Sequence, residues 1–145
     1  MLNRCDPAFV SALAESLSDG TLVPPEPRYL EEPRGRWQGQ AGVVAQPRTT
    51  DEVARIVRAC AAARVGIVPW GGGTGLVGGQ IMTGGPAPVL MSLERMTALR
   101  GAYPRENAMV VEAGMVLADV QAEAETMDRL FPLNLASEGS CRIGG

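Results

Sequence analysis

Six glycines occupy the nine positions from 71 to 79, directly after the apolar stretch IVPW. Because glycine has no Cβ, successive backbone N–H groups can point together at an anion, and a ligand can approach the main chain closely. A strand that runs into such a loop is therefore a candidate cradle for a phosphate or pyrophosphate. A flexible surface turn that binds nothing has the same composition, so the rest of the chain must decide between the two interpretations.

The residue types that the chain lacks exclude several kinds of chemistry. The sequence has no His, and all thirteen of its basic residues are Arg. A phosphate loop built on Lys, a Schiff-base lysine and a Ser-His or Cys-His nucleophile are therefore impossible within it. Cys5, Cys60 and Cys141 are far apart and have no His co-ligands, which predicts reduced thiols, with Cys60 in the core, and no metal site.

The charge pattern and the N-terminal residues bear on partners and location. The net charge is −3, and the arginines form no run, so we expect no nucleic-acid partner. The first residues contain no apolar stretch long enough for a signal or membrane segment, and Asp6 and Glu15 are atypical of a transit peptide. The sequence therefore predicts a cytoplasmic protein without an integral membrane segment.

The hydrophobic pattern predicts a first α/β unit around the glycine loop. A helix over 7–17 is followed by an irregular, proline-rich arm over 19–39. A strand over 43–46 then leads to a helix that starts with a capping box of Thr49 and Glu52 and ends at Gly66. Buried strands are expected on either side of the glycine loop, at 67–70 and 88–93. The residues expected on the buried face of the second helix are Val53, Ile56, Val57 and Cys60.

A second unit is predicted after Glu94. A strand over 108–114 precedes a helix over 115–129, and the segment 131–145 is expected to be coil. The helix is expected to place Leu117, Val120, Ala124 and Met127 on one side. The chain ends in a bare Gly-Gly that is typical of the middle of a loop, so we expect a truncated protein.

The stretch GTGLVG, from Gly73 to Gly78, matches the dinucleotide fingerprint GxGxxG, and Glu94 follows where a ribose-binding acid would be sought. A Rossmann loop must open into a helix whose N-terminus holds the pyrophosphate. Apart from Gly79, residues 79–89 contain two further glycines and two prolines, and they are not expected to form such a helix. The anion is instead expected on loop amides, assisted by the Thr74 hydroxyl and by further exposed amides in 137–145.

With these segments in view, the sequence resembles the FAD-binding domain of the vanillyl-alcohol oxidase, or FAD-linked oxidase, superfamily. It is most similar to the group of D-2-hydroxyglutarate, D-lactate and glycolate dehydrogenases. The resemblance covers residues 29–145 and rests on six segments in the family's order: YLEEPRGRWQG, VVAQPRTTDEVARIV, GGGTGLVGG, VLMSLERMTAL, MVVEAGMVLADVQ and FPLNLASEGSCRIGG. It implies an α+β fold of the FAD-binding PCMH type, with the first α/β subdomain and the start of the second.

Carried over residue by residue, the resemblance implies two groups of FAD-binding positions. The pyrophosphate loop and the residues leading into it are Pro69, Trp70, Gly71, Gly72, Gly73, Thr74, Gly75, Leu76, Gly78 and Gly79. The later segment places Pro132 and Leu133 near the isoalloxazine ring and runs along the dinucleotide at Gly139, Ser140, Ile143, Gly144 and Gly145. Residues 112–114 are expected to pack behind this segment.

The resemblance also implies how the domain is used. Relatives that tether FAD covalently commonly do so through a His near the loop, so non-covalent FAD is expected here, with Cys141 as the alternative tether. In relatives, a C-terminal cap domain supplies substrate-binding Arg residues and a His-containing, often metal-associated, catalytic site. We therefore expect an N-terminal helix and arm (1–39), a first FAD-binding subdomain (40–94), the start of a second (95–145) and no cap.

The function implied is the FAD-binding portion of an oxidoreductase that oxidises D-2-hydroxy acids and passes electrons to a separate acceptor, with this chain inactive alone. The alternative is a non-enzymatic module that keeps the fold for protein interaction without flavin. Trp37 and Trp70 are expected to serve in packing. The acidic side chains at 31–32 and 121–128 are expected to lie on solvated surfaces, with no catalytic residue among them.

Overall fold

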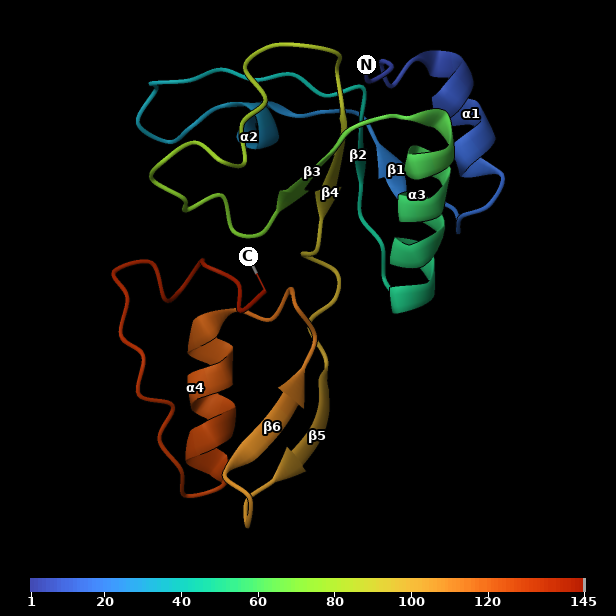
Figure 1. The fold of residues 1–145 in the computed structure, drawn as a ribbon. Helices are drawn as coiled ribbons and strands as arrows, with labels where there is room; N and C mark the ends of the chain where they lie inside the picture. The colour runs from blue at the N-terminus through green and yellow to red at the C-terminus, as the bar shows by residue number, and fades with distance from the viewer. Residues whose placement is uncertain (145) are drawn as a thin grey trace.

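The computed structural model describes residues 1–144, which form two groups of elements joined after β4 (Figure 1). The first group contains a four-stranded sheet with two longer helices on one face, and the second contains a two-stranded sheet with one helix. The first comprises α1 (Pro7–Ala14), β1 (Leu22–Val23), α2 (Pro27–Leu30), β2 (Val43–Ala45), α3 (Thr50–Ala63), β3 (Ile67–Trp70) and β4 (Val89–Ser92). The second comprises β5 (Leu99–Tyr103), β6 (Ala108–Val111) and α4 (Leu117–Thr126).

The strand order in the larger sheet is β1-β2-β4-β3. β2, β4 and β3 are parallel, with Val89 of β4 level with Val43 on one side and Ile67 on the other, whereas β1 is an antiparallel edge strand. Parallel strands place their carboxyl ends at one edge of a sheet, where the loops of open α/β sheets bind ligands. The glycine loop after β3 and the turn after β4 are therefore at the same edge.

The ends of α3 differ in part from the sequence prediction. Thr49 is the N-cap, and its hydroxyl accepts from the N–H of Glu52, as expected for a capping box. The Glu52 carboxylate accepts from the N–H of Arg48 at 2.7 Å and from the Thr21 hydroxyl, which leaves the box half formed. The helix ends at Ala63 rather than at Gly66, because Arg64 takes the left-handed conformation (φ 54°) and donates its N–H to the last turn.

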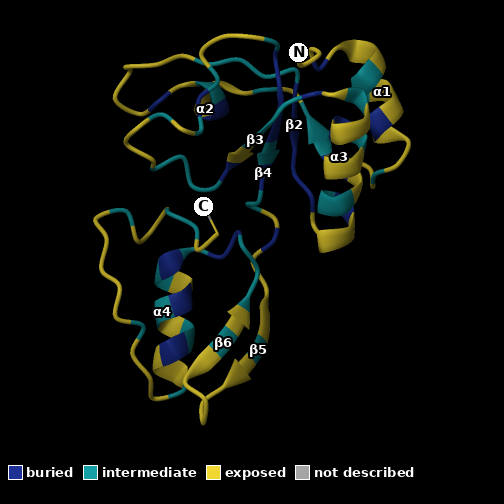
Figure 2. Cartoon of the chain, viewed as in Figure 1, coloured by how far each residue is buried: buried dark blue, intermediate teal, exposed yellow. Residues whose placement is uncertain are grey.

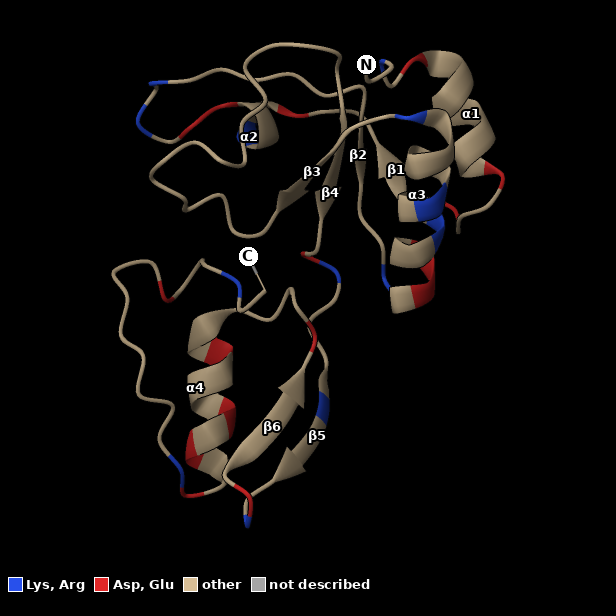
Figure 3. Cartoon of the chain, in the orientation of Figure 1, with Lys and Arg blue, Asp and Glu red and all other residues tan. Residues whose placement is uncertain are grey.

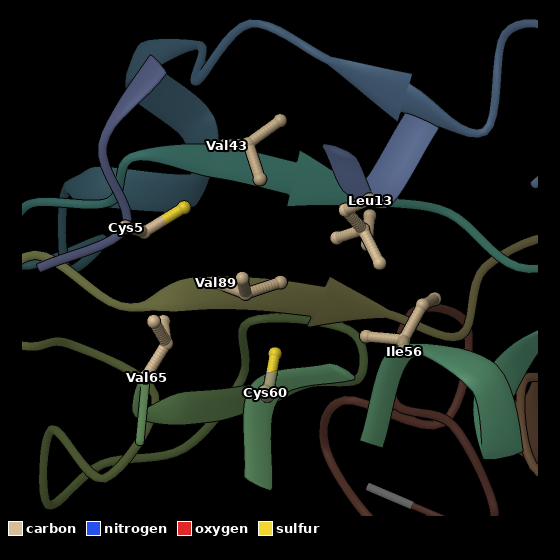
Figure 4. Close-up of a cluster of buried hydrophobic side chains, with 8 residues drawn as sticks. Cys5, Leu13, Val43, Ile56, Cys60, Val65 and Val89 are labelled. Carbon is tan, nitrogen blue, oxygen red and sulfur yellow. The ribbon is translucent and has the colours of Figure 1, made fainter. Parts of the chain in front are cut away.

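The main core lies between the sheet and the helices α1 and α3 (Figure 4). Cys60 is buried there, as predicted, and Ile56 faces the same interior. Val57 was expected on this face but is 42% exposed, because the packed stripe follows Ile56 and Cys60, which are four residues apart, as on one face of a helix. The buried cluster consists of Cys5, Leu13, Val43, Ala45, Ile56, Cys60, Val65 and Val89.

The prediction that residues 19–39 are irregular is wrong in part, because this segment contains β1 and α2. β1 pairs with β2 through Leu22 and Ala45, so the segment adds a strand to the sheet. Pro27 lies in the first turn of α2, where its fixed φ suits a helix and the missing N–H is not needed. α1 is also shorter than predicted, ending at Ala14.

The second group of elements differs from the sequence prediction mainly in its first strand, β5, which was not predicted. Four of its five residues are exposed, so the strand shows no alternation of buried and exposed side chains. Gly101 lies at an irregularity in its pairing with β6. α4 is shorter than the predicted span of 115–129 and buries Leu117, Val120 and Ala124 as expected (Figure 2). Met127 is the C-cap residue, outside the helix.

Candidate functional site

The glycine loop leaves β3 at the carboxyl edge of the sheet and has no helix after it. Residues 79–88 contain no helix, as predicted. Gly73 (φ 70°) and Gly78 (φ 72°) hold the left-handed conformation that glycine adopts without strain. The match to GxGxxG therefore does not correspond to a Rossmann site, because no helix N-terminus faces an anion here.

The main-chain N–H groups of this loop form its set of potential hydrogen-bond donors. Within residues 1–144, none of the backbone N–H groups of residues 72–79 donates a hydrogen bond to another protein atom. Two carbonyl groups of the loop, in contrast, do have partners: the Gln80 side-chain amide donates to the oxygens of Gly73 (3.3 Å) and Gly75 (3.1 Å). Eight successive donors thus stay available for an external acceptor, and the loop has no charged residue (Figure 3). This donor set fits a phosphate or pyrophosphate group.

Close packing fixes the shape of the loop at three glycines. A Cβ on Gly73 would lie 2.9 Å from the Trp70 ring, and one on Gly78 would lie 2.9 Å from the Trp37 ring. Both tryptophans therefore pack against the loop, as expected from the sequence. A Cβ on Gly72 would lie 2.0 Å from the main-chain oxygen of Ser140, so the loop touches the C-terminal segment there.

A polar network around the buried Tyr29 packs against Trp70. The Trp70 ring meets Tyr29 edge-on, with centroids 4.9 Å apart and an interplanar angle of 71°. The Tyr29 hydroxyl donates to Glu94 (3.0 Å) and accepts from Gln46 (2.6 Å). Glu94 also accepts from Arg28 of α2. The network thus links α2 with the residues that follow β2 and β4, and Tyr29 connects it to Trp70, which precedes the glycine loop.

The protonation of this network is set by opposing effects at Glu94 and Tyr29. Burial works to raise the pKa of Glu94, but hydrogen bonds from Arg28, Tyr29 and Ser92 outweigh it and hold the pKa below its ordinary value. Burial, followed by the charge of Glu94, raises the pKa of Tyr29. Both effects favour an ionised Glu94 beside a neutral Tyr29, which is the pairing that the hydrogen bond requires.

A second polar contact holds the outer turn of the loop. The Arg34 side chain donates to the carbonyl of Leu76 and to Glu32 at 2.7 Å. The Glu32 side chain was expected on a solvated surface but is buried, with the residue only 2% exposed, because it also accepts from the N–H groups of Arg34 and Arg36. The hydrogen bond from the Arg34 side chain, and then those from the main chain, lower the pKa of Glu32.

A cavity of about 350 Å³ lies between the glycine loop and the C-terminal segment. Nine of the seventeen residues that the sequence and its resemblance assigned to FAD line it: Pro69, Trp70, Gly71, Gly72, Gly73, Thr74, Gly75, Gly79 and, from the second group of elements, Gly144. Leu76 and Ser140 line an adjoining hollow on the other side of the loop. Gly145 lies outside the described residues.

The remaining predicted positions line neither hollow. Gly78 packs under Trp37, and Gly139 and Ile143 lie on the exposed C-terminal segment. Pro132 and Leu133 are exposed in the coil after α4, where the Leu133 carbonyl accepts from Gln121. The part of the chain that the structure describes therefore does not bring the two expected ring-contacting residues to the glycine loop.

The C-terminal segment contributes a side chain that sequence reasoning missed. Its amides were expected to face the ligand, but those of Ser140 and Cys141 donate to the Ser137 carbonyl. Those of Ile143 and Gly144 donate to Met115 and Ala113, so the segment packs against residues 113–115, which overlap the expected range 112–114 but lie one residue further along the chain. Arg142 lines the cavity instead. The sequence did contain a signal for this residue, because Arg142 is the single basic residue in the Gly/Ser-rich stretch SEGSCRIGG.

The fold and site together define the class of protein. The chain superposes with a TM-score of 0.85 on alkyldihydroxyacetonephosphate synthase, with 18% identity, over 99% of this chain and 29% of that one. The mixed α+β architecture is therefore that of the FAD-binding PCMH-type fold, as predicted. Within residues 1–144, no helix is long and apolar enough to cross a membrane.

Sequence comparison gives the family. Residues 41–145 match the family described as FAD binding domain, so the chain belongs to that family and FAD is its cofactor. It is 35% identical over 138 residues to the mitochondrial D-2-hydroxyglutarate dehydrogenase of Bos taurus, covering 92% of this chain and 25% of that protein. It is 36% identical over 110 residues to the D-2-hydroxyglutarate dehydrogenase of Xanthomonas citri pv. viticola, covering 76% and 23%. The chain thus spans about a quarter of the length of these relatives.

Proposed function

We propose that this chain holds FAD with its pyrophosphate on the loop of residues 71–79, as part of a flavin-dependent oxidoreductase that acts on D-2-hydroxy acids. The observation that carries the proposal is the run of N–H groups from 72 to 79, which have no acceptor among residues 1–144 and lie beside a cavity. Converging amides stabilise negative charge without a counter-ion. Leu76 and Ser140, which line the adjoining hollow, belong to the same proposed site.

The chain's own residues bind and orient the cofactor in this proposal. Gln80 occupies the loop carbonyls of Gly73 and Gly75, which removes two acceptors from beside the loop N–H groups. Trp70 and Trp37 fix the positions of Gly73 and Gly78 from behind. When bound, FAD supplies the redox chemistry, accepting a hydride equivalent from the substrate and passing electrons to a separate acceptor. Pro132 and Leu133 beside the ring, and Gly139, Ile143 and Gly145 along the dinucleotide, remain proposals.

The substrate class and the wider organisation rest on the relatives that are named D-2-hydroxyglutarate dehydrogenases. Because the chain contains no His, it has no imidazole for a general base, and we propose that it does not oxidise substrate alone. The division into 1–39, 40–94 and 95–145 belongs to the same proposal. The cytoplasmic location stays a prediction, since the bovine relative is named mitochondrial.

The test is a titration of the purified chain with FAD, followed by fluorescence quenching, together with an oxidation assay on D-2-hydroxyglutarate, D-lactate and glycolate. We expect saturable FAD binding without turnover, and release of the flavin into the supernatant on acid precipitation. A yellow precipitate would instead identify a covalent tether, with Cys141 as the candidate. A folded chain that binds no FAD would contradict the proposal and favour a non-enzymatic interaction module.

A further inference from the structure

The cavity beside the glycine loop has one charged lining residue, Arg142, and its other lining side chains are neutral. Arg142 lies at an isolated bridge with Val116, so its backbone is fixed against the segment before α4. Within residues 1–144 no carboxylate forms an ion pair with it. The positive charge at the cavity wall is therefore not neutralised by a described side chain.

The guanidinium of Arg142 is also incompletely hydrogen-bonded. Its Nη1 donates to the carbonyl of Gly114. Its Nε is buried and, among the described residues, is the one buried side-chain nitrogen or oxygen without a partner. A buried donor on a charged group is costly to leave unpaired, so such a group commonly indicates a missing acceptor.

We propose that Arg142 is an anion-recognition residue that binds the pyrophosphate of FAD from the side opposite the glycine loop. This inference rests on the proposed function, because it assigns a residue to the same cavity. A guanidinium presents several N–H donors in a rigid plane and suits phosphate oxygens. The glycine loop then supplies neutral N–H donors from one wall of the cavity, and Arg142 supplies a positive charge from the other. That charge offsets the negative charge of the pyrophosphate, which neutral amides do not neutralise.

The competing explanation is that Arg142 only anchors the C-terminal segment through Gly114. The two explanations differ in ligand preference and in salt dependence. An anchor affects every flavin ligand alike through the shape of the site. A contact between the Arg142 charge and the pyrophosphate strengthens the binding of FAD and ADP but not that of riboflavin, and its contribution to affinity decreases as salt screens the charges.

The experiment compares the full chain with Arg142→Gln, Arg142→Lys and, as a matched loss of charge, Arg58→Gln on the exposed surface of α3. FAD, ADP and riboflavin are titrated at low and high NaCl, and the melting temperature of each apo variant is recorded. We expect Arg142→Gln to bind FAD and ADP at least about tenfold more weakly, to bind riboflavin as the wild type does, and to lose most of the salt dependence. Arg142→Lys should retain the salt dependence, and Arg58→Gln should match the wild type.

Two results would overturn the assignment. One is wild-type FAD affinity and salt dependence in Arg142→Gln, and the other is an equal loss for riboflavin and FAD. If Arg142→Gln does not fold, Arg142→Lys and competition of wild-type FAD binding by inorganic pyrophosphate decide, and failure of pyrophosphate to compete rejects the inference. A wild-type chain that binds no FAD rejects the proposed function as well, whereas an unaffected Arg142→Gln rejects only the role of Arg142.

Discussion

Replacement of Gly72 by Ala tests the contact between the glycine loop and the C-terminal segment. The added Cβ would lie 2.0 Å from the Ser140 carbonyl oxygen, 2.9 Å from its carbon and 3.0 Å from Cys141 Cα. All three atoms belong to the main chain, so no side chain can rotate away. The two segments must separate by about 1 Å before the closest contact becomes tolerable, and over-packing of this kind costs about 1–3 kcal/mol.

The same displacement affects binding. The N···O distance of hydrogen bonds from N–H groups to oxygen lies mostly between about 2.7 and 3.2 Å. A shift of about 1 Å therefore breaks a hydrogen bond from a loop N–H group to a phosphate oxygen that the C-terminal segment holds in place. A hydrogen bond to a charged group contributes about 1.5–3 kcal/mol. We therefore expect FAD affinity to fall about tenfold to 100-fold.

The assay combines thermal unfolding of the apo chain with FAD titration. Gly84→Ala is the matched control, because its Cβ meets nothing within 4 Å and Gly84 does not line the cavity. We expect the melting temperature of Gly72→Ala to fall by about 3–10 °C, and that of the control to change little. A Gly72→Ala chain with wild-type melting temperature and FAD affinity would refute both the close contact and its role in binding.

Further predictions concern the supporting network, the loop and the thiols. The folded-state pKa of Glu94 lies below the ordinary value of 4.5, so its ionised form stabilises the fold above that value and the contribution is lost as pH falls through the folded pKa. As pH falls below 4.5, the melting temperature should decline more steeply in the wild type than in Glu94→Gln; parallel curves would contradict the network. Gln80→Leu should weaken FAD binding about tenfold by releasing the loop carbonyls, with calorimetry as the measurement and unchanged affinity as the opposing result. Cys5 and Cys60 are buried with pKa values raised by burial to about 11, so a thiol reagent should modify Cys141 alone in the native chain, more slowly with FAD bound, as mass spectrometry would show.

The sequence determined the local features that depend on neighbouring residues. Gly and Pro in 79–88 rule out a helix by backbone preference alone, so the absence of a Rossmann site could be predicted. The apolar stretches of β2, β3 and β4 and the stripe of Ile56 and Cys60 in α3 follow from hydrophobic periodicity. β5 could not be predicted in this way, because an exposed strand without alternation owes its form to pairing with β6.

Only the tertiary structure decided which side chains meet at the site. Glu32 is a solvated acid by its local sequence and a buried acceptor in the fold, because Arg34 and the main chain close around it. The amides of Ser140, Cys141, Ile143 and Gly144, expected to face the ligand, donate within the protein, and the Arg142 side chain lines the cavity. The glycine loop was recognisable because its donors belong to one continuous stretch of backbone. The opposite wall depends on contacts between residues that are some seventy positions apart, such as Gly72 and Ser140, and no local pattern encodes such a contact.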